Sequence, residues 1–278
     1  NGGQGSDGQV LTSTGSGVAF EDAAGGGPTF KEAGTNFANS IMVGDDSTGT
    51  LDAATGNTAL GIDVFAALTS GDNNVAVGFA AMTALTTAYS SVAVGANALD
   101  SLTTGHSCTG VGHNSLAGVT TANHNVGVGL NTGVALTTGN GNTAIGSNTM
   151  NSGTTALNNT VVGTHSATAM TEGIGNTILG TVSAIALTTG DYNVTSGYAS
   201  GYAITTGDAN ICMGASAGLH ITTGSNNIGI GVNALNGLTT VSNETAVGHN
   251  ALRRLTSGST NSAFGSEALA YMTTGQGN

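Results

Sequence analysis

Hydrophobic and polar positions recur every seventeen residues along most of this chain. One glycine keeps its place in every unit, fourteen times without insertion or deletion: Gly44, Gly61, Gly78, Gly95, Gly112, Gly129, Gly146, Gly163, Gly180, Gly197, Gly214, Gly231, Gly248 and Gly265. Numbered from the residue four before each glycine, thirteen complete units run over residues 57–277, and Asn278 begins another. Residues 40–56 form a degenerate leading unit. So strict a period predicts one structural unit stacked at constant geometry.

The residue pattern within each unit predicts two short strands and two turns. Position 2 is β-branched and position 4 apolar in twelve of thirteen units, which favours an extended backbone. The glycine at position 5 suits a bend or a close backbone approach. Position 12 is apolar in every unit but one, where it is Gly153. Position 13 is threonine in every unit, and the residues after it are typical of turns.

The length of the unit decides the fold class. Seventeen residues are too few for a strand–helix–strand crossover, so we predict an all-β parallel β-solenoid (β-roll) of about fourteen coils. Equivalent residues would stack at about 4.8 Å and give a rod of about 67 Å. Position 1 is asparagine in ten of thirteen units, unbroken from Asn125 to Asn227. We expect it to form a ladder of amides, and the threonines to form a ladder of hydroxyls.

Position 3 of the strand is also small or apolar. Because neighbouring strand residues point to opposite faces, we expect position 3 to point away from the coil interior that positions 2 and 4 fill. A strand that is apolar on both faces needs a cover on both. We therefore predict a homo-oligomer, most simply a trimer. The residues predicted to line its axis are Ala59, Ala76, Ala93, Ala144, Val161 and Ile178.

Residues 1–39 do not follow the repeat, and we predict that they form a partly irregular connector to the solenoid of residues 40–278. Within the connector, residues 9–11 and 18–20 predict a hairpin, and residues 25–28 predict a flexible joint. No capping unit is visible in the sequence, although solenoids need caps. We therefore expect the chain to be a segment of a longer protein.

Charge and cysteine content exclude several classes of function. The net charge is −12 with only three basic residues, so we expect no binding to nucleic acid or anionic lipid. No apolar run reaches the ~18 residues that cross a membrane. Cys108 and Cys212 lie six coils apart, on the order of 29 Å, which is beyond disulfide reach.

Candidate chemical groups are sparse. Asp191 and Asp208 hold the same place in adjacent coils, where they could bind an ion, form a glycosidase pair or simply cap a turn. We favour the turn, and we predict no metal, no cofactor and no enzymatic activity.

A loose set of possible metal ligands comprises His106, Cys108 and His124, with His113 one bend away, and we expect these histidines to be solvated instead. GxG triplets occur without a following helix, so they predict no nucleotide loop.

The most variable positions of the unit are 10 and 11. They carry Tyr202, His220, Arg253, Arg254 and Tyr271. Exposed aromatic and basic side chains are candidate contacts for a host glycan or surface protein, and ordinary surface variation is the alternative.

The repeat resembles two families of attachment proteins. Residues 142–146 (NTAIG), 74–78 (NVAVG), 91–95 (SVAVG) and 244–248 (ETAVG) resemble the head repeats of trimeric autotransporter adhesins, although this unit is longer than theirs. The resemblance covers residues 40–278 and implies a left-handed β-roll and a trimer. Units of the NTAIGxxAL…LTTG type, and residues 8–20 (GQVLTSTGSGVAF), resemble repeats of bacteriophage tail fibres.

These features together predict a structural shaft segment of a trimeric attachment fibre, of the bacteriophage tail-fibre type. Its expected partners are its own copies, neighbouring parts of the fibre, and a host glycan or surface protein. Its expected place is extracellular, at a virion tail or a cell surface. The alternatives are a bacterial trimeric adhesin or another extracellular filament, an ice-binding solenoid with a threonine array, and a polysaccharide-degrading tailspike.

Overall fold

The structure, a computed structural model, describes residues 9–13, 18–22, 29–34, 36–44 and 48–278. Every regular element in these residues is a β-strand, and none is a helix. The strands are β1 (Gln9–Ser13), β2 (Val18–Asp22), β3 (Thr29–Gly34), β4 (Phe37–Gly44), β5 (Ala54–Thr55), β6 (Thr58–Gly61), β7 (Val75–Val77), β8 (Val92–Val94), β9 (Thr109–Val111), β10 (Val126–Val128), β11 (Thr143–Ile145), β12 (Thr160–Val162), β13 (Thr177–Leu179), β14 (Val194–Ser196), β15 (Ile211–Met213), β16 (Ile228–Ile230), β17 (Thr245–Val247), β18 (Ser257–Ser259), β19 (Ser262–Phe264) and β20 (Thr274–Gln276).

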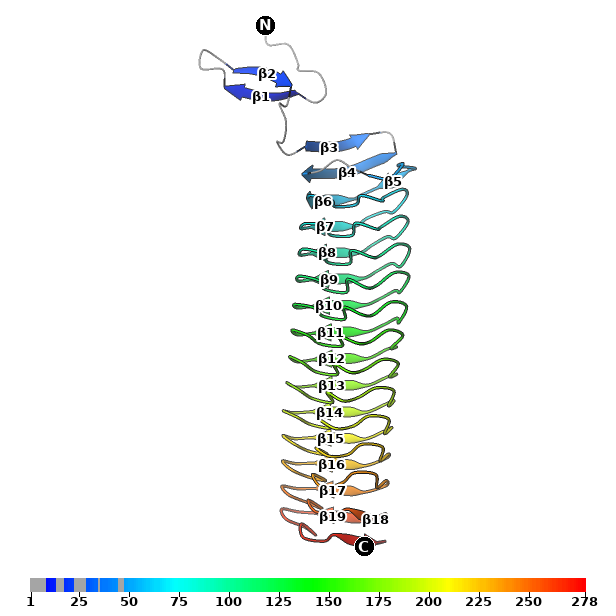
Figure 1. The fold of residues 1–278 in the computed structure, drawn as a ribbon, viewed down its shortest axis with the longest axis vertical. Coiled ribbons are helices and arrows are strands. Elements are labelled where there is room, and N and C mark those ends of the chain that lie inside the picture. The colour runs from blue at the N-terminus through cyan, green and yellow to red at the C-terminus, as the bar shows by residue number, and fades with distance from the viewer. Residues whose placement is uncertain (1–8, 14–17, 23–28, 35, 45–47) are drawn as a thin grey trace.

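The repeats form a single rod of stacked coils (Figure 1). One strand from each coil joins a continuous sheet, in which β4, β6 to β17 and β19 lie side by side in chain order. All of these pairs are parallel, and each residue faces its equivalent seventeen residues later, as Val126 faces Thr143. The parallel β-solenoid of about fourteen coils is therefore confirmed.

The N-terminal stretch contains two antiparallel pairs. β1 and β2 pair with Gln9 opposite Asp22, which confirms the two expected strands of the hairpin. β3 pairs with β4, and β4 in turn pairs in parallel with β6, with Gly44 opposite Gly61. The degenerate unit thus joins the solenoid sheet. The joint predicted at residues 25–28 lies outside the described residues.

A second wall of each coil returns opposite the sheet. Its backbone also bonds from coil to coil at position 13, where the amide of Thr69 donates to the carbonyl of Thr86 at 3.0 Å. The Thr69 hydroxyl donates to that same carbonyl, also at 3.0 Å. The threonine ladder is therefore real, but its hydroxyls bond to backbone carbonyls and not to one another.

The buried asparagines of position 1 join successive coils at one edge of the sheet. The side-chain oxygen of Asn142 accepts from both the backbone amide and the side-chain amide of Asn159, at 3.1 and 3.0 Å. The same side-chain amide of Asn159 also donates to the Gly173 carbonyl at 2.6 Å. Each asparagine thus satisfies backbone groups in two coils, as buried polar groups require, and the amide ladder is confirmed.

The recurring glycine is required by both its backbone angle and its surroundings. Gly146 has φ +133°, and a Cβ atom there would lie 2.5 Å from the carbonyl oxygen of Gly163 in the next coil. Only glycine combines this angle with so close an approach of two backbones.

Position 3 points into the coil, so the prediction that it lines a trimer axis was wrong. The six residues assigned to that axis are buried in the core of their own chain: Ala59, Ala76, Ala93, Ala144, Val161 and Ile178. Neighbouring residues of a strand point to opposite faces, and the middle residue of each three-residue strand is the buried one. Positions 2 and 4, which were expected inside, therefore face outward.

Position 9 explains why position 3 is small in most coils. In coil 91–107, Ala93 accompanies Leu99 in the core, whereas in coil 176–192 Ile178 accompanies Ala184. A Cβ atom built on Gly127 would lie 2.6 Å from Cγ of Leu116. The two positions therefore share one volume, as close packing demands.

Candidate functional site

The outward face of the sheet is apolar along the rod. Position 2 carries half-buried valine, isoleucine or threonine in most coils. Position 4 carries large side chains that are exposed in the single chain: Leu60, Val94, Ile145, Leu179, Met213, Ile230 and Phe264. We name positions 2 and 4 together the sheet face. Parallel sheets are normally covered on both faces, and long apolar patches mark interaction surfaces.

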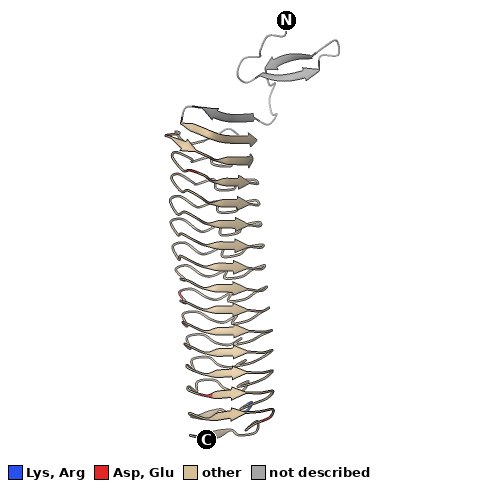
Figure 2. Ribbon diagram, turned by 180° about the vertical axis from the view of Figure 1, so that it is seen from behind, with Lys and Arg blue, Asp and Glu red and all other residues tan. Residues whose placement is uncertain are grey.

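Charged residues are sparse along the rod, and Figure 2 shows them as a few coloured segments on a mostly tan ribbon. The chain has three basic residues, Lys31, Arg253 and Arg254, against fifteen acids. The two arginines are adjacent in one coil. They are therefore the one concentration of positive charge in the sequence.

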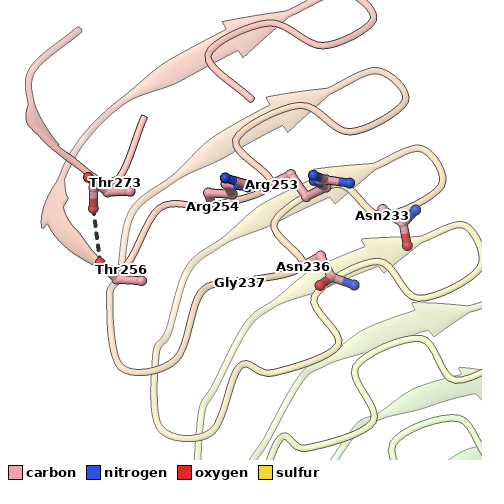
Figure 3. Close-up of a pocket in the computed structure, with 7 residues that line it drawn as sticks. All are labelled: Asn233, Asn236, Gly237, Arg253, Arg254, Thr256 and Thr273. Carbon is pink, nitrogen blue, oxygen red and sulfur yellow. Dashed lines mark hydrogen bonds between the residues drawn. The ribbon is translucent and has the colours of Figure 1, made fainter. Parts of the chain in front are cut away.

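The arginines line an open cavity of about 500 Å³ that spans three successive coils (Figure 3). We name it the arginine cavity. Its lining residues are Asn233, Asn236, Gly237, Arg253, Arg254, Thr256 and Thr273.

The backbone around the cavity is fixed by bonds between coils. The amide of Gly237 donates to the Arg253 carbonyl at 2.8 Å, and a Cβ atom on Gly237 would lie 2.7 Å from that oxygen. The hydroxyl of Thr256 donates to the Thr273 carbonyl at 3.1 Å. Asn236 donates from its side chain to the Ser216 carbonyl at 3.3 Å. Glycine at 237 therefore lets the preceding coil lie close to the backbone of the arginines, without a side chain between the two coils.

Both guanidinium groups retain free hydrogen-bond donors. Within the described residues, neither Arg253 nor Arg254 forms an ion pair or a side-chain hydrogen bond. The guanidinium carbon of Arg254 lies 5.2 Å from the ring centroid of Tyr271, which is itself 69% exposed. This cation–π contact orients Arg254 and leaves its N–H groups available.

The structure brings together only some of the predicted surface contacts. Arg253 and Arg254 line the cavity, and Tyr271 lies outside its lining but contacts Arg254, while Tyr202 is exposed three coils from the arginines. His220 lies nearer, with Nδ1 2.7 Å from the Asn236 carbonyl. Sequence reasoning missed Asn233 and Asn236, because asparagine is common at the turns of this repeat and these two carry no distinguishing signal.

Asp191 and Asp208 act as turn caps in the structure. An oxygen of Asp191 accepts from the backbone amide of Ile174 at 2.7 Å, and one of Asp208 accepts from the amide of Asp191 at 2.8 Å. Asn123 and Asn140 do the same in other coils. This geometry supports the turn interpretation. Among the described residues, no group of three or more His, Cys, Asp or Glu side chains could hold a metal.

The His106 ring stacks on that of Tyr89 and meets that of His124 edge-on. Its centroid lies 4.5 Å from that of Tyr89 and 5.2 Å from that of His124. The Cys108 thiol is directed at backbone oxygens, those of Ala122 at 3.3 Å and His106 at 3.6 Å. The three residues suggested as loose metal ligands therefore do not converge.

Both cysteines are free and buried, as their separation predicted. Burial raises the pKa of the Cys108 thiol, and it raises the pKa of Cys212 to about 12. Thiols with raised pKa values are poor nucleophiles at neutral pH. Their environment is that of buried structural residues.

Glu244 replaces asparagine in the buried column of position 1. Its two carboxylate oxygens accept from the backbone and side-chain amides of Asn261, at 3.1 and 3.3 Å. Burial raises the pKa of this carboxyl, and the hydrogen bonds from Asn261 oppose that rise. The glutamate thus keeps the column's acceptor role.

Comparisons with protein-family models, curated proteins and solved structures find no match to this chain. Within the described residues, no helix has the length and apolar character needed to cross a membrane.

Proposed function

We propose that this chain is a structural shaft segment of a trimeric attachment fibre of the bacteriophage tail-fibre type, located outside the cell and without enzymatic activity. The rod supplies length and stiffness, because each coil bonds to the next through the sheet, the asparagine column and the threonine ladder. Such a rod would hold binding sites away from a particle or cell surface.

The single observation that carries the proposal is the sheet face. Position 4 is apolar in every coil from Leu60 to Ile230 except at Ser196, and several of these side chains are about 40% exposed, such as Leu179 and Met213. In water this surface costs free energy in proportion to its area. Three copies of the same rod arranged in parallel, with their sheet faces toward a common axis, would cover it at every coil, because all copies have the same coil spacing.

Sedimentation equilibrium tests the trimer directly. The chain has a mass of 26.7 kDa, so we expect a species of three times that mass. Ile145→Lys places a charge on the sheet face and should shift the mass toward the monomer. The matched control is Thr138→Lys, at an exposed position of the neighbouring coil wall. A wild-type monomer at all concentrations would contradict the proposal, and a trimeric Ile145→Lys variant would place the assembly on another surface.

A bacterial trimeric adhesin or another extracellular filament is the alternative that shares this architecture. The sheet face supports both settings equally, so the trimer measurement does not separate them.

Ice binding is a second candidate, favoured by one specific observation. Position 14 forms a file of exposed threonines, including Thr87, Thr104, Thr121 and Thr138. They recur at the ~4.8 Å coil spacing. The hydroxyls of position 13 bond to backbone carbonyls instead, which leaves a single file and not a two-dimensional array. Thermal hysteresis checks this candidate, since a purely colligative freezing-point depression would exclude it.

A further inference from the structure

We propose that the arginine cavity binds an acidic sugar residue, one that bears a carboxylate or a sulfate. The ligand would be one that the proposed attachment fibre binds. The biological role of this binding rests on the proposed function, but the binding itself does not. The site itself is built from residues of one chain.

The first argument is charge. Arg253 and Arg254 are the only basic residues after Lys31 in a chain of net charge −12. Within the described residues neither guanidinium is paired with an acid, although each has five N–H donors arranged to bind planar anions. An unpaired guanidinium pair at the wall of a cavity offers an anion its strongest hydrogen-bonding partners on this rod.

The second argument is the composition of the cavity wall. Asn233 and Asn236 supply amide groups that both donate and accept, which suits the hydroxyl groups of a sugar. Tyr271 is not part of the wall, but its exposed ring lies beside Arg254, and an apolar ring face suits the C–H edge of a pyranose. The volume of about 500 Å³ fits one or two sugar residues.

The third argument is what the rest of the rod excludes. Nucleic acids carry one charge per ~1.7 Å of duplex and require many cationic contacts. This rod provides two, within a strongly acidic chain that repels a densely charged polymer. An acidic polysaccharide with isolated charges can place a single anionic group at the arginines.

Titration calorimetry with defined oligosaccharides tests the proposal on the whole chain. The ligands are an oligouronate, a sulfated oligosaccharide and a neutral oligosaccharide of the same length. We expect an acidic ligand to bind at least tenfold more tightly than the neutral one, and the affinity to fall as salt rises. Preference for the oligouronate or the sulfated ligand identifies the anionic group. Equal binding of acidic and neutral ligands, no binding at millimolar ligand, or tighter binding of single-stranded DNA would overturn the proposal.

Substitutions locate the site. Arg254→Gln should weaken acidic binding about tenfold or more, because a charge-assisted hydrogen bond is lost, and Arg253→Gln together with Arg254→Gln should abolish it. Lys31→Gln removes the same charge from β3, at the opposite end of the sheet order from β19, and should leave binding unchanged. Binding unaffected by the double substitution would contradict the site.

Sedimentation of the same samples separates this proposal from the fibre itself. A trimer that binds no acidic sugar would remove the cavity's role and leave the shaft function standing. A monomer that binds the acidic sugar would support the cavity's role and contradict the trimeric shaft.

Discussion

The interior of the rod is filled in two different ways. In the first coils of the rod, and again from residue 227 onward, position 3 is alanine or glycine and position 9 is usually leucine, methionine or phenylalanine, as in Ala246 with Leu252. In the coils between residues 159 and 226 the sizes are reversed, as in Ile178 with Ala184 and Cys212 with Gly218. The backbone register of the sheet is the same in both regions.

This difference shows what the fold requires of its core. A large residue at one of the two positions accompanies a small one at the other in most coils, although coil 125–141 has glycine at both, Gly127 and Gly133. Position 9 residues adopt a left-handed backbone in both regions, for example Leu252 at φ +48° and Ala184 at φ +46°. The backbone is therefore set by the inter-coil bonds, and the side chains adjust within it.

The largest effect should follow removal of the large side chain where it lies at position 3. Ile178→Ala leaves a cavity beside Ala184, which is too small to fill it. We expect a loss of about 2–5 kcal/mol in the free energy of unfolding, measured by guanidinium denaturation.

Ile145→Ala is the matched control, since it removes the same atoms from the outward face, where the side chain is 38% exposed. It should cost less free energy of unfolding in the dissociated chain. A larger loss for Ile145→Ala than for Ile178→Ala would contradict the assignment of position 3 to the interior.

A smaller effect should follow conversion of one packing type into the other. Gly218→Leu alone overfills the coil, because a side chain there meets the sulfur of Cys212. We expect it to cost about 1–3 kcal/mol. Adding Cys212→Ala creates the alanine–leucine pairing found at Ala246 and Leu252, and should recover much of that loss. A double-mutant cycle measures the coupling, and strictly additive effects would mean that the two positions do not share one volume.

The sequence was sufficient for the fold but not for the orientation of the strand. The unbroken period and the turn residues predicted the parallel solenoid, because every coil must repeat one geometry. The pattern of apolar residues could not decide which side of the strand is inside, since position 3 is small or apolar, position 4 is apolar, and position 2 alternates between aliphatic residues and threonine. The reciprocal sizes at positions 3 and 9, visible in Ile178 with Ala184, carried that information.

The candidate site was only partly predictable for a similar physical reason. Arg253, Arg254 and Tyr271 stood out by residue type; the two arginines line one cavity, and Arg254 contacts Tyr271. Asn233 lies two coils before Tyr271 in the chain, and its place in the cavity depends on the stacking of coils. A repeat length predicts which residues are equivalent, but not which turn positions border one cavity.

The smallest effect concerns the column of position 1, where Glu244 interrupts the asparagines. Because burial raises the pKa of this carboxyl above its ordinary value, the folded chain binds the proton more tightly than the unfolded chain. Stability therefore falls as pH rises from the ordinary glutamate pKa to the raised one, and the loss remains at higher pH.

Glu244→Gln keeps an acceptor for Asn261 and removes the charge, so it should raise the thermal midpoint at pH 8 and change it little at pH 3. Glu267→Gln, at an exposed position of the next coil, is the control and should have little effect at either pH. Equal stabilisation by Glu244→Gln at both pH values would show that its charge is not the cause.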